Sequence, residues 1–116
     1  MVNKNNEIVR KFIKHIQNIQ TYCQGKSYED FITNSQLADA CIFNLSQIGE
    51  LTNRIDDDFA ALHPTVPWDK IYGLRNRIVH DYEGINFKMI WSIIEQDLDS
   101  LLQTLLEILQ SNEENK

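Results

Sequence analysis

Residues 8–23, with the sequence IVRKFIKHIQNIQTYC, decide the fold class of this chain. Apolar side chains recur there at steps of three and four residues, which places them along one face of an α-helix. Gly25 follows as a stop signal for that helix, and Ser27 is positioned to cap a short helical turn. The shared face consists of Ile8, Val9, Phe12, Ile13, Ile16, Ile19 and Cys23. The stretch therefore predicts an amphipathic first helix.

The helical period continues along the chain. A second long helix is expected over 35–54, a third from Pro67 to about His80, and a fourth that begins after its cap, Asn86. No window alternates with a period of two, so no strands are expected. The sequence therefore predicts a single all-α domain, 1–116, with 111–116 as a frayed tail. Its architecture is an up-and-down bundle of four principal helices plus one or two short ones.

Two features of these helices suggest close packing. Gly49 lies inside the second helix, where glycine costs about 1 kcal/mol relative to alanine, so we expect it to allow close approach of another helix. The last helix is apolar at Ile93, Ile94, Leu105 and Leu106, which exceeds one narrow stripe. A second buried surface would explain the excess, and a homodimer would provide one.

The formal net charge of −6 argues against non-specific nucleic-acid binding, which depends on a basic surface. Lys70, Arg75 and Arg77 still allow a small basic cleft, so we expect RNA to bind only locally. No apolar run exceeds four residues, and the start carries no signal-peptide pattern, so we expect a cytoplasmic protein without a membrane segment. Cys23 and Cys41 are expected to be free, buried thiols.

Residues 75–82, RNRIVHDY, concentrate groups suited to phosphodiester chemistry without a metal or cofactor. A histidine accepts and donates protons near neutral pH, and an arginine stabilises charge on phosphate oxygens. We expect His80 to be the acid–base group and Arg75 the phosphate stabiliser, with Asn76 and Arg77 in support. The 2′-hydroxyl of RNA would attack and leave a 2′,3′-cyclic phosphate, whereas DNA should be inert.

Helix geometry constrains this motif. Arg75 and His80 are five residues apart, about 140° around a helix, so they would not meet on one intact helix. Either the helix loosens before Asp81, or a second copy completes the site. Asn76 and His80 share a face, so we expect Asn76 to position His80. Transfer also needs both a base and an acid, and two facing chains would supply two histidines.

Ordinary structural roles compete with this interpretation. His80 could cap the end of its helix, and Tyr82 could simply pack in the following turn. Arg75 could pair with Asp69 or Glu50. Glu50 is more typical of a solvated or paired glutamate than of an orienting carboxylate.

Other conspicuous residues favour structure over chemistry. The acidic run 56–58, with His63 nearby, suits the start of a short helix better than a metal site. Trp68 and Trp91 are expected to anchor a core or an interface. Gly73 could admit a partner backbone or a phosphate, or could reflect ordinary helix packing.

The motif lies within a longer resemblance. Residues 68–82, WDKIYGLRNRIVHDY, resemble the signature of HEPN-domain toxins of the HepT type, and 40–50 and 85–102 resemble flanking parts of that family. The resemblance implies a helical bundle that forms a homodimer, with the two R-x4-H motifs facing a shared cleft. It further implies a metal-independent ribonuclease, the toxin of a toxin–antitoxin pair, with Arg75 and His80 as its catalytic residues.

The resemblance also implies a partner and a control point. The partner is a minimal nucleotidyltransferase of the MntA type, which neutralises the toxin by attaching AMP to the tyrosine that corresponds to Tyr82. A bulky, negatively charged adduct two residues from His80 would block the cleft and repel phosphate. Two other hypotheses stay open. One is a non-catalytic module that binds nucleotide or is presented to a nucleotidyltransferase, and the other is a purely structural dimerisation bundle.

Overall fold

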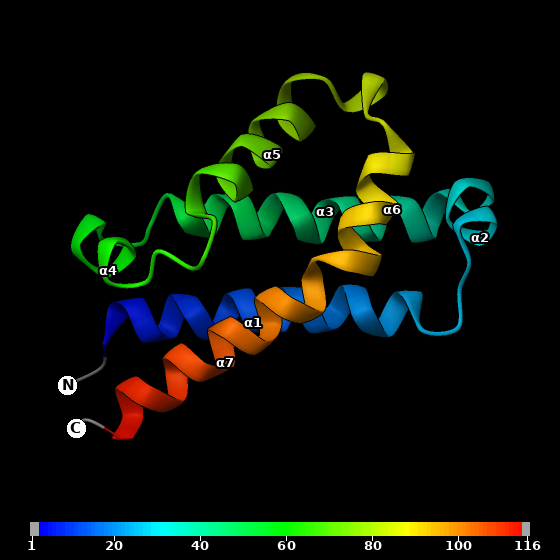
Figure 1. Cartoon of the computed structure of the whole chain (residues 1–116). Coiled ribbons are helices and arrows are strands. Elements are labelled where there is room, and N and C mark those ends of the chain that lie inside the picture. Colours follow the sequence, from blue (N-terminus) through cyan, green and yellow to red (C-terminus); the bar gives the residue numbers. More distant parts are fainter. Residues whose placement is uncertain (1–2, 115–116) are drawn as a thin grey trace.

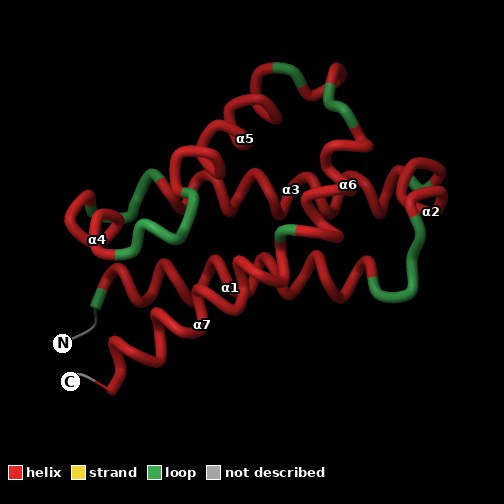
Figure 2. Tube along the Cα trace, in the orientation of Figure 1, coloured by secondary structure: helices red, strands yellow, loops and turns green. Residues whose placement is uncertain are grey.

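The computed structural model describes residues 3–114, and every regular element in that range is a helix. Two long antiparallel helices form its base, and a short helix connects them (Figure 1). Figure 2 shows that loops fill only the short connections between helices. The all-α prediction is therefore confirmed. The elements are α1 (Lys4–Cys23), α2 (Tyr28–Thr33), α3 (Ser35–Thr52), α4 (Asp57–Leu62), α5 (Trp68–His80), the 3-10 turn η1 (Tyr82–Gly84), α6 (Phe87–Gln96) and α7 (Leu98–Glu114).

Local signals end and begin these helices close to the expected places. Gly25 follows α1 with a φ of 74°, a left-handed conformation that glycine adopts without strain. Ser27 and Asp30 form a reciprocal capping box at the start of α2. The Asn86 side chain caps α6. Helix α5 begins at Trp68, one residue later than expected, and Pro67 is its N-cap residue.

The single long helix expected after Asn86 is divided at Asp97 into α6 and α7, which run in clearly different directions (Figure 1). The reason lies in packing, because α6 contacts α2 whereas α7 contacts α1. The break lets one apolar stripe follow two differently oriented partners. Helix α7 reaches Glu114 and so includes 111–114 of the segment expected as a tail, whereas 115–116 lie outside the described residues.

The break also accounts for part of the apolar excess on this segment. Ile94 and Leu105 are buried within the chain itself, Ile93 is half-buried, and only Leu106 is exposed. Trp91 is buried against Phe31, with ring centroids 5.3 Å apart, so it is a core residue. No helix within residues 3–114 combines the length and the apolar character needed to cross a membrane.

Helix α3 is the centre of the bundle, with α1 packed on one side and α5 on the other (Figure 1). The contact with α5 is closest at Gly49, because a Cβ built there would lie 2.1 Å from the Cβ of Arg75 and 3.2 Å from its Cα. Any side chain at position 49 would thus collide with the α5 backbone region. The close approach predicted for Gly49 is confirmed.

The two cysteines are free, as expected, but they also touch. The Sγ atoms of Cys23 and Cys41 are 3.4 Å apart, which joins the end of α1 to α3. Cys41 is buried and Cys23 half-buried. The hydrogen bond between the thiols lowers the pKa of Cys23 and, together with burial, raises the pKa of Cys41.

Iodoacetamide is therefore expected to alkylate Cys23 well before Cys41 in the folded protein. The thiolate is the reactive form, so the thiol with the lower pKa and the greater access reacts first. Peptide mass mapping after brief alkylation at mildly alkaline pH measures the order. Equal labelling of both thiols in the native state would contradict this assignment, and unfolding in guanidinium should remove the difference.

Candidate active site

Helix α5 carries the motif and is regular to its last residue. It spans Trp68–His80, and the Asp81 N–H still donates to the Arg77 carbonyl at 2.9 Å. The helix does not loosen before Asp81, which removes one of the two ways in which Arg75 and His80 could meet. Their side chains leave one intact helix about 140° apart. A single chain thus presents the arginine and the histidine in different directions.

Arg75 is held firmly on the α3 side of α5. Its Nε donates to Oε1 of Glu50 in a charge-assisted hydrogen bond, and its Nη1 donates to Oδ1 of Asn76 at 2.8 Å. The guanidinium also lies over the ring of Tyr72, 5.9 Å from its centroid. These contacts fix the guanidinium plane and leave its remaining N–H groups unpaired among the described residues. Of the two partners considered for Arg75, Glu50 is the one observed and Asp69 is not.

The role expected for Asn76 changes accordingly. Asn76 shares a face with His80, but its carbonyl oxygen accepts a hydrogen bond from Arg75. It therefore orients the arginine and not the histidine. The preceding residue, Arg75, is the observed partner, because its guanidinium donates a charge-assisted hydrogen bond.

His80 is exposed at the end of α5, and its imidazole makes no hydrogen bond with any described side chain or backbone group. An imidazole without a structural partner is available to take or give a proton. His80 does lie in the last turn of α5, where a basic side chain suits the helix dipole, but its ring makes no hydrogen bond to the carbonyl groups there.

The basic residues near Arg75 do not gather into one cleft. Arg77 turns toward the start of α6, where its Nη1 lies 3.5 Å from Sδ of Met89. Lys70 lines a different hollow, on the side of α5 that faces α7. The expected basic cluster is thus dispersed around the helix, and Arg75 alone faces α3.

Tyr82 is tied to α3 by a residue that the sequence analysis did not single out. Its hydroxyl donates to Oδ1 of Asp39 at 2.5 Å, across 43 positions of sequence. This hydrogen bond, with smaller effects of burial and of the carboxylate charge, raises the pKa of Tyr82. Asp39 and Glu50 are about three turns apart on α3 and so share a face. The three-turn spacing of Asp39 and Glu50 was the signal in the sequence that could have identified Asp39.

Two exposed apolar side chains lie between these polar contacts. Val79 follows Arg75 by one helical turn and is 52% exposed. Phe43 lies one turn after Asp39 on α3 and is 59% exposed. We call the surface formed by Asp39, Phe43, Glu50, Arg75, Val79 and Tyr82 the α3–α5 face. It combines the charged groups of the motif with apolar surface that the chain itself does not cover.

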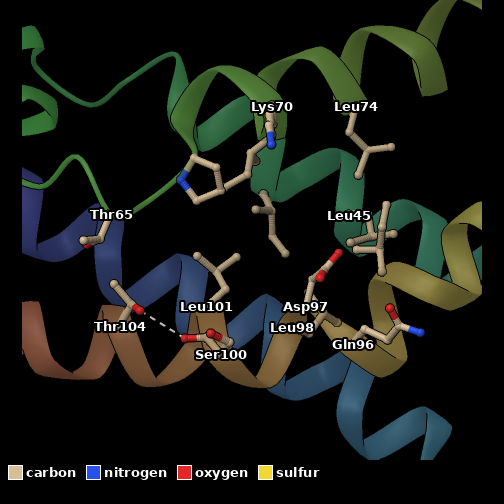
Figure 3. Close-up of a pocket in the computed structure, with 14 residues that line it drawn as sticks. Leu45, Thr65, Lys70, Leu74, Gln96, Asp97, Leu98, Ser100, Leu101 and Thr104 are labelled. Atoms are coloured by element: carbon tan, nitrogen blue, oxygen red, sulfur yellow. Dashed lines mark hydrogen bonds between the residues drawn. The ribbon is translucent and has the colours of Figure 1, made fainter.

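A separate hollow lies away from this face. A groove of about 490 Å³ separates α5 from the α6–α7 junction, with α3 as its floor (Figure 3). Lys70 and Leu74 reach into it from α5, and Asp97 and Leu101 face them from the other wall. Neither Arg75, His80 nor Tyr82 lines this groove. Its volume alone therefore says nothing about the chemistry of the motif.

The acidic run has structural contacts. Asp56 accepts hydrogen bonds from Lys4 and Asn5, at 3.3 and 3.2 Å, and so joins the start of α1 to the loop before α4. The His63 ring packs against Phe59, with centroids 4.6 Å apart. Within residues 3–114, no three histidine, cysteine or acidic side chains cluster as metal ligands would.

Comparison with known proteins identifies a family for this sequence. The family described as "Ribonuclease HepT-like" matches residues 12–108, a range that includes most of the bundle and all of the motif. The chain belongs to the HepT-like ribonuclease family. The membership confirms the family resemblance found in the sequence, and it classes the chain with RNA endonucleases.

Individual relatives of this HepT-like chain carry consistent names. A protein named "Putative RNase" from Caldanaerobacter subterraneus subsp. tengcongensis is 36% identical over 75% of this chain and 78% of its own length. One named "Probable ribonuclease HepT" from Thermococcus cleftensis is 31% identical over 74% of this chain and 78% of its own. A third, "Putative RNase" of Methanocaldococcus jannaschii, is 38% identical over 64% and 68%. No solved structure matches at a significant level.

Proposed function

We propose that this chain is the metal-independent endoribonuclease toxin of a toxin–antitoxin pair and cuts RNA in a cleft shared by two copies. A nucleotidyltransferase antitoxin of the MntA type would silence it by attaching AMP to Tyr82. The observation that carries the shared cleft is the intact α5, which points Arg75 and His80 about 140° apart on one chain. A second copy can bring its own motif to the same phosphate.

The composition of the α3–α5 face supports a second copy as its cover. Phe43 and Val79 are more than half exposed, and Val79 lies one helical turn from the arginine of the motif. Apolar surface in this position is better buried against another protein than left in water. The contact would place the two α5 helices near one another, because Val79 is on α5 itself.

The chemistry balances with two histidines and no other co-reactant. His80 of one copy takes the proton of the RNA 2′-hydroxyl, whose oxygen attacks the adjacent phosphorus. The bond from phosphorus to the 5′-oxygen breaks, and His80 of the second copy donates a proton to that leaving oxygen. Arg75 stabilises the charge on the non-bridging oxygens as it grows. The products are a 2′,3′-cyclic phosphate and a 5′-hydroxyl.

Glu50 and Asn76 contribute by orienting Arg75. Because Nε and Nη1 are occupied, the guanidinium presents its remaining edge in a fixed direction. The ion pair with Glu50 would also hold the Arg75 guanidinium away from the phosphate until the 2′-oxygen is in line for attack. This arrangement suits transition-state stabilisation more than tight ground-state binding, in agreement with the net charge of −6.

RNA cleavage by the purified chain is expected to persist in excess EDTA. The fragments should end in 2′,3′-cyclic phosphate and 5′-hydroxyl, and an oligonucleotide with a single deoxyribose at the cut site should be resistant. Gel analysis of end-labelled RNA and mass spectrometry of the fragments give these results. Loss of cleavage on chelation, restored by added metal, would refute a metal-independent mechanism, as would cleavage of the deoxy-substituted strand.

The toxin role has its own test. Expression of this chain alone in bacteria should arrest growth, whereas co-expression with an MntA-type nucleotidyltransferase should relieve the arrest. A non-catalytic module that binds nucleotide would leave growth unaffected when expressed alone. The dispersed basic residues of α5 are the observation that most favours this rival.

A further inference from the structure

We propose that Asp39 is the positioning residue for modification of Tyr82, holding the phenol hydroxyl against α3 and receiving its proton when a nucleotide is transferred to the oxygen. The inference rests on the proposed function, because it concerns the nucleotide transfer that silences the toxin. It extends that function to a residue outside the motif. Asp39 lies on α3, whereas the motif lies on α5 and the turn after it.

The first support is the geometry of the contact. The Tyr82 hydroxyl donates to Oδ1 of Asp39 at 2.5 Å, which is the distance of a strong hydrogen bond to a carboxylate. Tyr82 is 47% exposed in the single chain, so a partner enzyme that meets the uncovered face can reach this side chain while Asp39 holds its oxygen in place. A tyrosine in a surface turn would otherwise rotate among rotamers. Fixing its oxygen lowers the entropy lost when the transfer reaction begins.

The second support is the state of the carboxylate. No lysine or arginine in the range 3–114 pairs with Asp39, whereas Glu50, on the same face of α3, is neutralised by Arg75. Asp39 therefore has no cationic partner among the described residues, and only its Oδ1 accepts a hydrogen bond from them. Both acidic residues face α5, but only Glu50 is paired with a cation.

The chemistry of the transfer explains why an acceptor is needed. The phenol oxygen attacks the α-phosphorus of a nucleoside triphosphate, and the bond from that phosphorus to pyrophosphate breaks. The phenol proton passes to the Asp39 carboxylate, which later releases it to water. Tyrosine and nucleoside triphosphate thus yield nucleotidyl-tyrosine, pyrophosphate and one proton. A phenol is a weak nucleophile while it keeps its proton, so a base in contact accelerates the step.

The test measures transfer of label from α-³²P-ATP to the folded chain by an MntA-type nucleotidyltransferase. Asp39→Asn keeps the shape and an oxygen that can accept the hydrogen bond, but it is a poor base. We expect its turnover rate to fall about 10²-fold, with the KM for ATP and the binding of the two proteins unchanged. Asp39→Glu should recover most of the rate, since it restores a carboxylate.

Matched variants complete the design. Asp69→Asn removes another exposed carboxylate, on α5, and should be labelled at the wild-type rate. Tyr82→Phe should take no label. Circular dichroism melting verifies that each variant is folded, so that a slow rate reports chemistry.

The outcomes separate this inference from the function beneath it. Labelling of Asp39→Asn at the wild-type rate, or a slower rate caused only by a raised KM, would overturn the role of Asp39 and leave Tyr82 as the target. Failure of the wild-type chain to be labelled at Tyr82 would overturn the proposed modification and, with it, this inference. RNA cleavage is assayed separately and is independent of both results.

Discussion

Replacing His80 with alanine is expected to lower RNA cleavage by about 10²- to 10⁴-fold, the range for loss of a general acid–base group. The fold should survive, because His80 is exposed and its imidazole makes no hydrogen bond with any described residue. Initial rates on a fluorogenic RNA, with thermal melting as the control for folding, measure both effects. A His80→Ala variant with wild-type activity would remove this residue from the mechanism.

The same variant tests whether the cleft is shared. If both copies must supply His80, a dimer with one altered copy is inactive. Equal amounts of wild-type and His80→Ala chains should be refolded together. The mixture should then keep about a quarter of the activity of the same total amount of wild-type protein, because only that fraction of dimers forms from two wild-type chains at random. Simple dilution, which leaves half of the activity, would indicate that each chain acts alone.

Replacing Gly49 with alanine should have the second large effect. The new Cβ would lie 2.1 Å from the Cβ of Arg75, so α3 and α5 must move apart. Overpacking typically costs about 1–3 kcal/mol, and alanine regains about 1 kcal/mol of helix propensity, so we expect a net loss of up to about 2 kcal/mol in the free energy of unfolding. The rate of RNA cleavage should fall by more than the loss of folded protein explains, because displacement of the guanidinium by about 1 Å can cost 10²-fold in rate.

Gly73 provides the matched control for stability. It lies in α5 two residues before Arg75, and a Cβ built on it meets no heavy atom within 4 Å. Gly73→Ala should therefore raise the free energy of unfolding by about 0.4–1 kcal/mol. Urea denaturation of both variants gives the comparison. Equal effects of the two substitutions would contradict the tight contact at Gly49. The open space also means that packing within the chain does not require glycine at position 73.

Periodicity and capping predicted much of the fold because they act over a few residues. The apolar face of α1, the stop at Gly25 and the caps at Ser27 and Asn86 all depend on neighbours within one helical turn. The break at Asp97 was not predictable in this way. Neither glycine nor proline lies there, and the bend follows from the different directions of α1 and α2.

For the candidate site, the sequence predicted the positions of the residues on the helix but not their contacts. The motif placed Arg75, His80 and Tyr82 on or beside α5, and helix geometry alone separated the arginine from the histidine. The contacts that these residues make with α3 could not be predicted from the sequence. Whether Glu50 or Asp69 pairs with Arg75, and that Asp39 receives Tyr82, depends on the register between two helices, which Gly49 sets.

The way in which α5 is held has a further consequence for how this molecule loses activity. Helix α5 buries only Ile78 among its residues and packs chiefly on α3, whereas α1 buries seven residues and α3 nine. Elements with few buried residues open at lower free energy than the whole domain. Backbone amides of α5 should therefore exchange with deuterium faster than those of α1 and α3. Mild heat should then abolish cleavage while most helical signal remains, because α5, which carries the motif, detaches from a bundle that is otherwise still folded.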